Sequence, residues 1–160
     1  MSEQLLVELQ ATLEREIPIS RSMGIRVYSH AACGLKMAAP LDPNRNHQQT
    51  AFAGTLNALC TLAGWGTVFL LAREQNRPGN IVIRRSAIKY LRPVTSELMI
   101  AHCAAPGSEQ REHFIEMLNE KGSSKIDLDV EIIDRGQVAV SFRGSYVVLG
   151  ENHGMPRGEF

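Results

Sequence analysis

Residues 51–72, AFAGTLNALCTLAGWGTVFLLA, contain no charged side chain over 22 consecutive positions. A segment of this length and composition is long enough to cross a lipid bilayer. However, three Gly, three Thr and Asn57 interrupt its apolar character, and no second segment of this kind follows. We therefore expect a helix that is buried on nearly all sides within a protein core, and no membrane partner.

On the N-terminal side of this segment, the sequence predicts a short helix and two strands. The helix covers residues 2–16, with Ser2 as its N-cap and a leucine face formed by Leu5, Leu6, Leu9 and Leu13. The strands cover residues 24–32 and 35–39, with Gly34 in the turn between them. A run rich in proline and asparagine then leads irregularly into the long helix.

On the C-terminal side, the long helix is expected to begin near Gly54 and to end before the stop signal at residues 77–80, RPGN. Four strands and a second amphipathic helix follow, with the strands at 81–91, 98–105, 126–132 and 138–148 and the helix at 108–121. A helix that is apolar on all faces must be shielded from water on all faces, and an antiparallel sheet that curls around the helix shields it. The order of elements therefore predicts an α+β hot-dog fold in one domain, residues 1–150, followed by a flexible tail at 151–160.

Composition narrows the class of protein. Apolar residues make up 44% and charged residues 21% of the 160 residues, which excludes wholesale disorder. Lys+Arg and Asp+Glu are equal at 17 each, so no nucleic-acid partner is expected. Cys33, Cys60 and Cys103 show no CxxC spacing, which argues against a disulfide framework and a zinc site. The N-terminus lacks a signal-peptide pattern, so we expect a cytoplasmic protein. Histidines do not cluster with cysteines or acids at ligand spacing, so we expect no metal, and we expect no cofactor.

Two motifs carry a family resemblance. Residues 46–54, NHQQTAFAG, resemble the Asn-x-x-Gly-Thr-x-His-Gly-Gly loop of hot-dog acyl-thioesterases, and residues 88–94, IKYLRPV, resemble a strand of the same superfamily that ends in an aromatic-Leu-Arg-Pro turn. With LDPN at 41–44 and LAGWG at 62–66, the chain resembles the YiiD C-terminal family over roughly residues 1–150. That family is generally labelled thioesterase, and some members are assigned as malonyl-ACP decarboxylases that prime fatty-acid synthesis. Because no acetyltransferase domain stands before the match in these 160 residues, we expect the stand-alone form.

The resemblance and the chemistry of the loop place the site where the loop enters the helix. Free N–H groups of the first helical turn at Gly54 can hold a thioester carbonyl oxygen and stabilise developing negative charge. Alternatively, Gly54 allows close packing between the helix and a strand. The uncharged amide of Asn46, which lies at the position of the family's loop asparagine, can orient a carboxylate or carbonyl; alternatively, it caps local backbone as a turn residue.

Other residues of the two motifs are expected to line the substrate site. These are His47, Thr50, Phe52, Ala53, Thr55, Asn57, Tyr90 and Arg92. His47 is either a general base or an ordinary surface histidine, because Phe52 occupies the position of the family's motif histidine. Cys60 is either a nucleophile or a small buried apolar side chain. Hot-dog sites usually lie between two subunits, which implies that Tyr90 or Arg92 serves the neighbouring pocket.

Two features bear on the binding partners of the protein: a basic run in the sequence, and the surfaces that the predicted fold leaves uncovered. Residues 84–92 contain Arg84, Arg85, Lys89 and Arg92. These side chains form either a docking patch for phosphopantetheine phosphate and an acidic carrier protein, or simply solvated strand ends. One sheet wrapped on one helix leaves a helix flank and a sheet edge uncovered. We therefore expect a homodimer or a dimer of dimers.

The absence of an acidic residue on the long helix indicates the type of reaction. In the related thioesterase subgroup a helix carboxylate lies fifteen residues after the loop asparagine, where this chain has Thr61, and no acid occurs between residues 48 and 73. Loss of a general base costs a hydrolase typically 10²–10⁴ in rate, whereas decarboxylation mainly requires donors at the thioester oxygen. The sequence thus favours decarboxylation of malonyl-ACP to acetyl-ACP, with Asn46, Gly54 and Thr61 as the catalytic positions. The alternatives are an acyl-CoA or acyl-ACP thioesterase and a non-catalytic module that binds acyl ligands.

Overall fold

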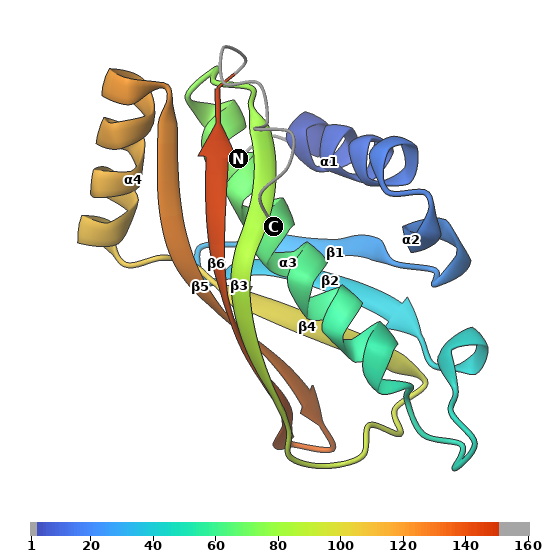
Figure 1. The fold of residues 1–160 in the computed structure, drawn as a ribbon. Helices are drawn as coiled ribbons and strands as arrows, with labels where there is room; N and C mark the ends of the chain where they lie inside the picture. The colour runs from blue at the N-terminus through green and yellow to red at the C-terminus, as the bar shows by residue number, and fades with distance from the viewer. Residues whose placement is uncertain (1–2, 151–160) are drawn as a thin grey trace.

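Six antiparallel strands and one long helix form most of the structure, a computed structural model that describes residues 3–150 (Figure 1). The helices are α1 Glu3–Glu16, α2 Ile19–Ser22, the 3₁₀ turn η1 Asp42–Asn44, α3 Ala53–Glu74 and α4 Ser108–Lys121. The strands are β1 Arg26–Ala31, β2 Gly34–Pro40, β3 Asn80–Tyr90, β4 Leu98–Ala104, β5 Ser123–Asp134 and β6 Gln137–Leu149. The expected Ser2 cap and the tail at 151–160 lie outside the described residues.

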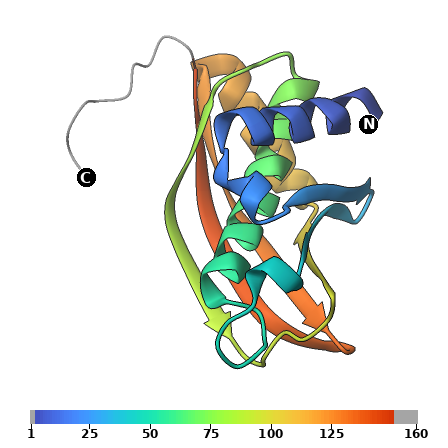
Figure 2. The same cartoon turned by 90° about the vertical axis from the view of Figure 1, so that its right-hand side faces the viewer.

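The strands form one curled sheet in the order β1-β2-β4-β5-β6-β3, and every pair is antiparallel. Figure 2 shows α3 inside the curve, with β3 and β6 on one side and β1 and β2 on the other. Alternation along β5 sets its two faces, because every second residue from Ser124 to Asp134 is buried and the residues between them from Lys125 to Ile133 are exposed. The expected sheet curled around a central apolar helix is confirmed.

The long apolar segment forms α3, one residue earlier than expected at its start and three residues before Arg77 at its end. It is long and apolar enough to cross a membrane, but 78% of its most apolar 18-residue window is buried inside the fold. Gly64 lets the sheet approach the helix closely, because a Cβ there would overlap the phenol ring of Tyr146. The Tyr146 hydroxyl donates to the Thr61 carbonyl at 2.8 Å, which fixes α3 against β6.

Local sequence signals explain where some of the other helices and strands begin and end. Gly122 ends α4 with a positive φ of 69°, as expected of a glycine after a helix, and β5 follows at once. The sequence does not predict the short helix α2, because Pro18 marks the end of the first helix. Pro18 instead caps α2, because a fixed φ near −60° and a missing N–H suit the start of a helix as well as they end one.

Candidate active site

The loop before α3 is closed by Asn46. The Asn46 amide nitrogen donates to Thr50 Oγ1 at 2.8 Å and to the Ala51 carbonyl at 3.3 Å. Its Oδ1 accepts from the backbone N–H groups of Gln48 at 2.9 Å and Thr50 at 3.1 Å. The half-buried amide is therefore fully engaged within its own loop. This geometry agrees with the turn-residue alternative for Asn46 and leaves no donor of that amide directed at a substrate.

Asn44 joins this loop to the rest of the fold. Its side chain is buried and donates to the carbonyls of Met23 at 2.8 Å and Pro40 at 2.7 Å. Its Oδ1 accepts from Thr55 Oγ1 at 3.1 Å, and its carbonyl accepts from the Phe52 N–H at 2.8 Å. The sequence places Asn44 in the irregular run rich in proline and asparagine, and an asparagine after proline carries no signal for contacts 21 residues away.

Thr55 is buried behind the site, where it bonds to Asn44, and its side chain does not line the site surface. The expectation that Thr55 contacts substrate is corrected by its burial and by the bond of its hydroxyl to Asn44. The helix period explains the difference, since residues 53 and 54 face outward and the next two positions turn into the core.

The N-terminus of α3 is exposed and has no side-chain cap. The N–H groups of Thr55 and Leu56 both donate to the Phe52 carbonyl. Ala53 and Gly54 are exposed residues, and their N–H groups have no acceptor among the described residues. The first turn contains no acidic residue, so these two donors and the positive end of the helix dipole are available to an incoming oxygen.

Two aromatic side chains border this helix end. A Cβ on Gly54 would overlap the ring of Phe52, which is 54% exposed. Tyr90 Oη donates to the Ala53 carbonyl at 3.3 Å from the end of β3. Gly54 is thus small because an aromatic ring lies over it, and the nearest atoms to a Cβ there belong to Phe52 rather than to a strand.

The site continues along one uncharged flank of α3. Asn57, Ala58, Thr61 and Trp65 are half-buried positions spaced as on one helix face, in line with exposed Gly54. Thr61 Oγ1 donates to Asn57 Oδ1 at 3.2 Å. The structure therefore brings three predicted positions, Gly54, Asn57 and Thr61, onto one surface.

The remaining predicted residues lie around the loop and the end of β3. His47 is exposed in the loop, and Thr50 is half-buried beneath the amide of Asn46. Arg92 is exposed just after β3, where its N–H and that of Leu91 donate to the Ala139 carbonyl.

Asp134 holds the segment that follows Arg92, and sequence reasoning missed it. The buried carboxylate accepts from Ser96 N–H at 3.0 Å and Thr95 Oγ1 at 3.3 Å. Burial alone would raise the pKa of the Asp134 carboxyl, but the hydrogen bonds from Ser96 and Thr95 hold that pKa below its ordinary value. The neighbouring Val94 carbonyl accepts from Ala51 N–H at 2.9 Å, so this clamp reaches the loop of the site.

Cys60 does not join the site chemistry. It is fully buried, and burial raises the pKa of its thiol to about 12, with a smaller contribution from Cys103. A thiol with this pKa stays protonated at neutral pH and is a poor nucleophile. Within residues 3–150, no three His, Cys, Asp or Glu side chains gather in a way that could hold a metal ion.

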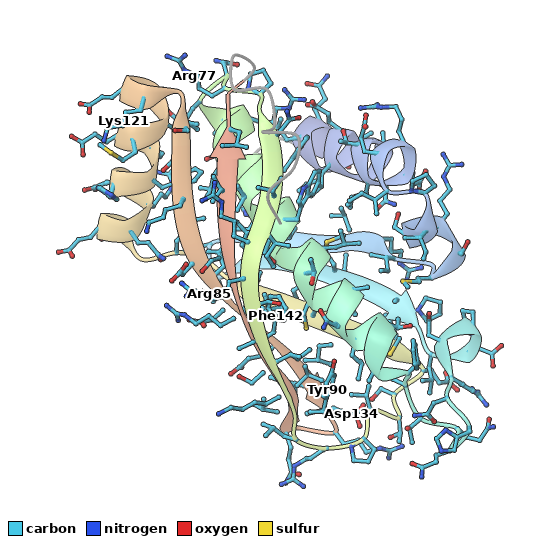
Figure 3. All side chains as sticks on the ribbon, in the orientation of Figure 1. Arg77, Arg85, Tyr90, Lys121, Asp134 and Phe142 are labelled. Carbon is cyan, nitrogen blue, oxygen red and sulfur yellow. The ribbon has the colours of Figure 1, made fainter. Side chains whose placement is uncertain are left out.

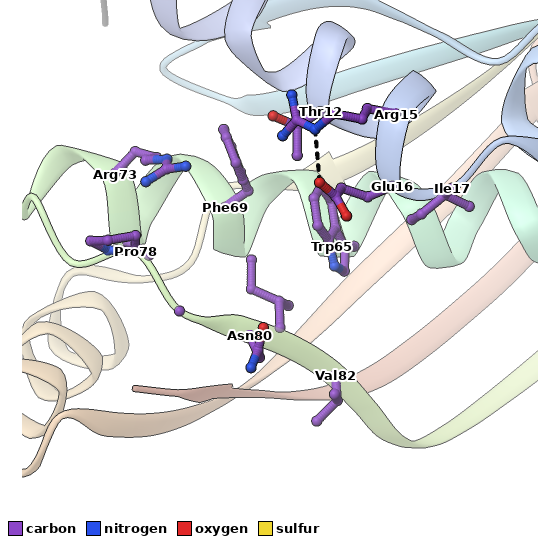
Figure 4. Close-up of a pocket in the computed structure, with 13 residues that line it drawn as sticks. Thr12, Arg15, Glu16, Ile17, Trp65, Phe69, Arg73, Pro78, Asn80 and Val82 are labelled. Atoms are coloured by element: carbon purple, nitrogen blue, oxygen red, sulfur yellow. Dashed lines mark hydrogen bonds and ion pairs between the residues drawn. The ribbon is translucent and has the colours of Figure 1, made fainter. Parts of the chain in front are cut away.

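A cavity of about 500 Å³ opens beside the other half of the same helix, between α1, α3 and the start of β3 (Figure 4). Trp65 and Phe69 stack on its wall with ring centroids 5.5 Å apart. Arg73 lies over the Phe69 ring at 5.1 Å and pairs with Glu8 at 2.9 Å. Because Trp65 belongs to both the flank and the cavity, an apolar chain lying along α3 has room beyond Thr61.

A six-stranded antiparallel sheet curled around one apolar helix, with an uncapped helix end as its candidate site, defines a hot-dog protein. The chain belongs to the family described as "Putative thioesterase (yiiD_Cterm)", whose model matches residues 6–150. This membership confirms the family resemblance of the loop and strand motifs.

Solved structures agree with this membership. A protein of unknown function from Chlorobaculum tepidum is 32% identical with a TM-score of 0.88, over 93% of this chain and 96% of that chain. A "putative thioesterase" from Shewanella oneidensis is also 32% identical, with a TM-score of 0.84 over 92% and 99% of the two chains. A thioesterase from Haemophilus influenzae is 13% identical with a TM-score of 0.67 over 94% of each chain, which shows the shared fold alone.

Proposed function

We propose that the protein hydrolyses acyl thioesters of coenzyme A or acyl carrier protein at the N-terminus of α3. The observation that supports this most directly is the exposed, uncapped helix end, where the N–H groups of Ala53 and Gly54 have no acceptor among the described residues. Donors placed there stabilise the oxyanion that forms when a thioester carbonyl is attacked. Membership in a family described as thioesterase supports hydrolysis over the decarboxylation that the sequence alone favoured.

Hydrolysis also needs a group that activates water. The half-buried flank of α3 offers no carboxylate, because residues 51–72 carry no charge. Between residues 46 and 52, the stretch that leads directly into this helix end, His47 is the one titratable side chain, and it is exposed. We assign water activation to His47, because an imidazole is the side chain that most often serves as a general base.

Decarboxylation of a malonyl thioester is the second candidate, and the uncharged flank supports it. A carboxylate at Thr61 would lie beside the substrate's own carboxylate and cost about 4 kcal/mol at 4 Å and an effective dielectric near 20. The flank instead presents the neutral pair Thr61 and Asn57. The same helix-end donors would stabilise the enolate left by departing CO₂.

The working form that we propose is a homodimer in the cytoplasm. On the inner face of β3, Ser86 and Tyr90 are exposed, although they pair with buried Gly144 and Val140 of β6. The space beside the flank of α3 is therefore open toward this edge strand. A second copy of the chain that covers the flank of α3 and the edge strand β3 would close the site and the strand edge together.

One experiment separates the candidates. Purified protein is incubated with acetyl-CoA, malonyl-CoA and malonyl-ACP, and the products are followed by mass spectrometry and a free-thiol assay. Hydrolysis releases free thiol from each good substrate, whereas decarboxylation yields an acetyl thioester without free thiol. An intact ligand that raises the melting temperature without turnover supports a non-catalytic binding module.

The His47 assignment is tested in the same assay. His47→Gln is expected to lower hydrolysis by at least roughly tenfold without a change in melting temperature. His113→Gln, an exposed histidine on α4, is the matched control and should keep full activity. Equal rates in wild type and His47→Gln would remove His47 from the mechanism.

A further inference from the structure

A groove lies on the outer face of the sheet, away from α3. Along β5 and β6, Ile126 and Tyr146 are buried toward the helix, whereas Lys125 and Ser145 face outward. Within the described residues, β4 pairs with β5 only over Ala101–Cys103, and α4 lies beside the rest of β5. The groove encloses about 600 Å³ and is lined by Arg84, Arg85, Gln110, His113, Lys125, Ile126, Asp127, Arg143, Ser145 and Val147.

The groove continues along α4. An adjoining hollow of about 350 Å³ shares Arg84, His113 and Lys125 with it and adds Lys121. The wall formed by α4 is tied to the strand, because Gln110 Nε2 donates to the Asp127 carbonyl at 2.7 Å. Figure 3 labels Arg85 on the side of β5 and β6 away from α3, and Lys121 on α4.

A β-bulge places two arginines on this one face. Along β3 the pairing passes from Ile83 opposite Tyr146 to Arg85 opposite Ser145, which leaves Arg84 as the extra residue. In a regular strand, neighbours face opposite sides of the sheet. Here both Arg84 and Arg85 line the groove, as expected where a bulge redirects a side chain.

The cations of the groove are available to a ligand. Among residues 3–150, Arg84, Arg85 and Lys125 form no ion pair. The nearby carboxylates are already engaged, because Arg143 pairs with Asp129 at 2.9 Å and approaches Asp127 within 3.8 Å. Since the whole chain has no net charge, this is a local concentration of positive charge.

We propose that this groove binds a phosphorylated small molecule, with Arg84 and Arg85 holding its phosphate. Two adjacent guanidinium groups present forked donors that match phosphate oxygens, and Lys125 adds a third positive charge. The groove volume of about 600 Å³ lies in the range of small-molecule sites. The proposal is independent of the acyl-thioester activity, because the groove and α3 lie on opposite faces of the sheet.

Inorganic pyrophosphate is the probe that tests this site. Titration at constant ionic strength, followed by calorimetry and backbone amide NMR, is expected to show saturable binding with shifts at residues 84, 85 and 125. Arg84→Gln and Arg85→Gln should each weaken binding by at least roughly fivefold. Arg26→Gln, which removes an exposed arginine from the opposite edge strand β1, is the matched control and should bind like wild type.

Three results would overturn the proposal. They are the absence of saturable binding up to about 10 mM pyrophosphate, equal weakening in Arg26→Gln, and tighter, Arg84-dependent binding of a short poly-glutamate peptide. The last result would identify an acidic protein as the partner. Melting temperatures of all variants are measured to show that each is folded, and the positions are exposed, so little change is expected.

Discussion

Two asparagines, two positions apart, hold the site through different contacts. Asn44 connects the loop to the end of β2, to the segment after α2 and to α3, and it is buried. Asn46 bonds only within residues 46–51 among the described residues, and it is half-buried. The shape of the candidate site therefore depends on amide side chains that themselves need not touch substrate.

The first prediction compares these two residues. Asn44→Ala should lower the free energy of unfolding by about 2–3 kcal/mol, because it leaves buried partners unsatisfied. Asn46→Ala should cost about 1 kcal/mol, because its loop is more exposed, and should reduce turnover at least tenfold through displacement of the loop. Urea unfolding and thioester turnover of both variants are the measurements. Unchanged kinetics in Asn46→Ala would show that the loop geometry does not control the reaction.

The second prediction concerns Thr61, where hydrolysis and decarboxylation diverge. Thr61→Glu adds a charge to a half-buried flank, so thermal melting must first show that the variant folds. In a folded variant, the new carboxylate is expected to weaken malonyl binding by about 4 kcal/mol if the groups lie near 4 Å. It should raise hydrolysis of acetyl thioester by acting as a base. A folded Thr61→Glu protein with wild-type malonyl kinetics would exclude this flank as the substrate surface.

At the scale of elements, Asp134 joins the β5–β6 hairpin to the segment between β3 and β4. That segment carries Val94, whose carbonyl accepts from Ala51 N–H beside the site loop. The bonded carboxylate is favoured in the folded state, which is why its pKa lies below the ordinary value. Its contribution to stability is therefore present above the unfolded pKa and is lost as the pH falls through the folded pKa.

The third prediction follows from the lowered pKa of the Asp134 carboxyl. Asp134→Asn should be less stable than wild type at pH 5–7, by about 1–3 kcal/mol for lost charge-assisted hydrogen bonds. The difference should shrink below about pH 4, as the wild-type carboxyl takes up its proton. Urea midpoints across this pH range provide the measurement, and Glu131→Gln, an exposed acid on the same strand, is the control. A stability difference that stays constant down to pH 2 would exclude this role of the carboxylate.

Helices and strands whose residues repeat with a regular hydrophobic period could be predicted from the sequence. Hydrogen bonds between segments far apart in the chain could not. The uncharged run of α3 and the alternation of β5 specify both elements and their buried faces. The helix end at Gly54 was found because glycine after an irregular loop is a local signal. The bonds of Asn44 and Asp134 join segments far apart in the chain, and no neighbouring residue predicts them. The bulge at Arg84 depends on the register with β6, which one strand's sequence does not contain.

At the scale of the whole molecule, the fold leaves one side open. β3 is an edge strand of 11 residues, and the flank of α3 beside it carries the candidate site. Exposed apolar side chains lie at the same end, because Phe52, Tyr90 and Leu91 are each about half exposed. An exposed edge of this length would template pairing with other chains unless a partner covers it.

The fourth prediction is that a second copy of the chain covers this side. Light scattering at about 10 μM should show at least a dimer, since stable homodimer interfaces keep their partners together well below this concentration. Ser86→Arg places a bulky charge on the inner face of β3, next to the open flank, and should shift the protein toward monomer and reduce turnover. Ser29→Arg makes the same change on the other edge strand, β1, and should leave both the mass and the turnover unchanged. A wild-type monomer, or dissociation by Ser29→Arg but not by Ser86→Arg, would show that β3 and the α3 flank are not the interface.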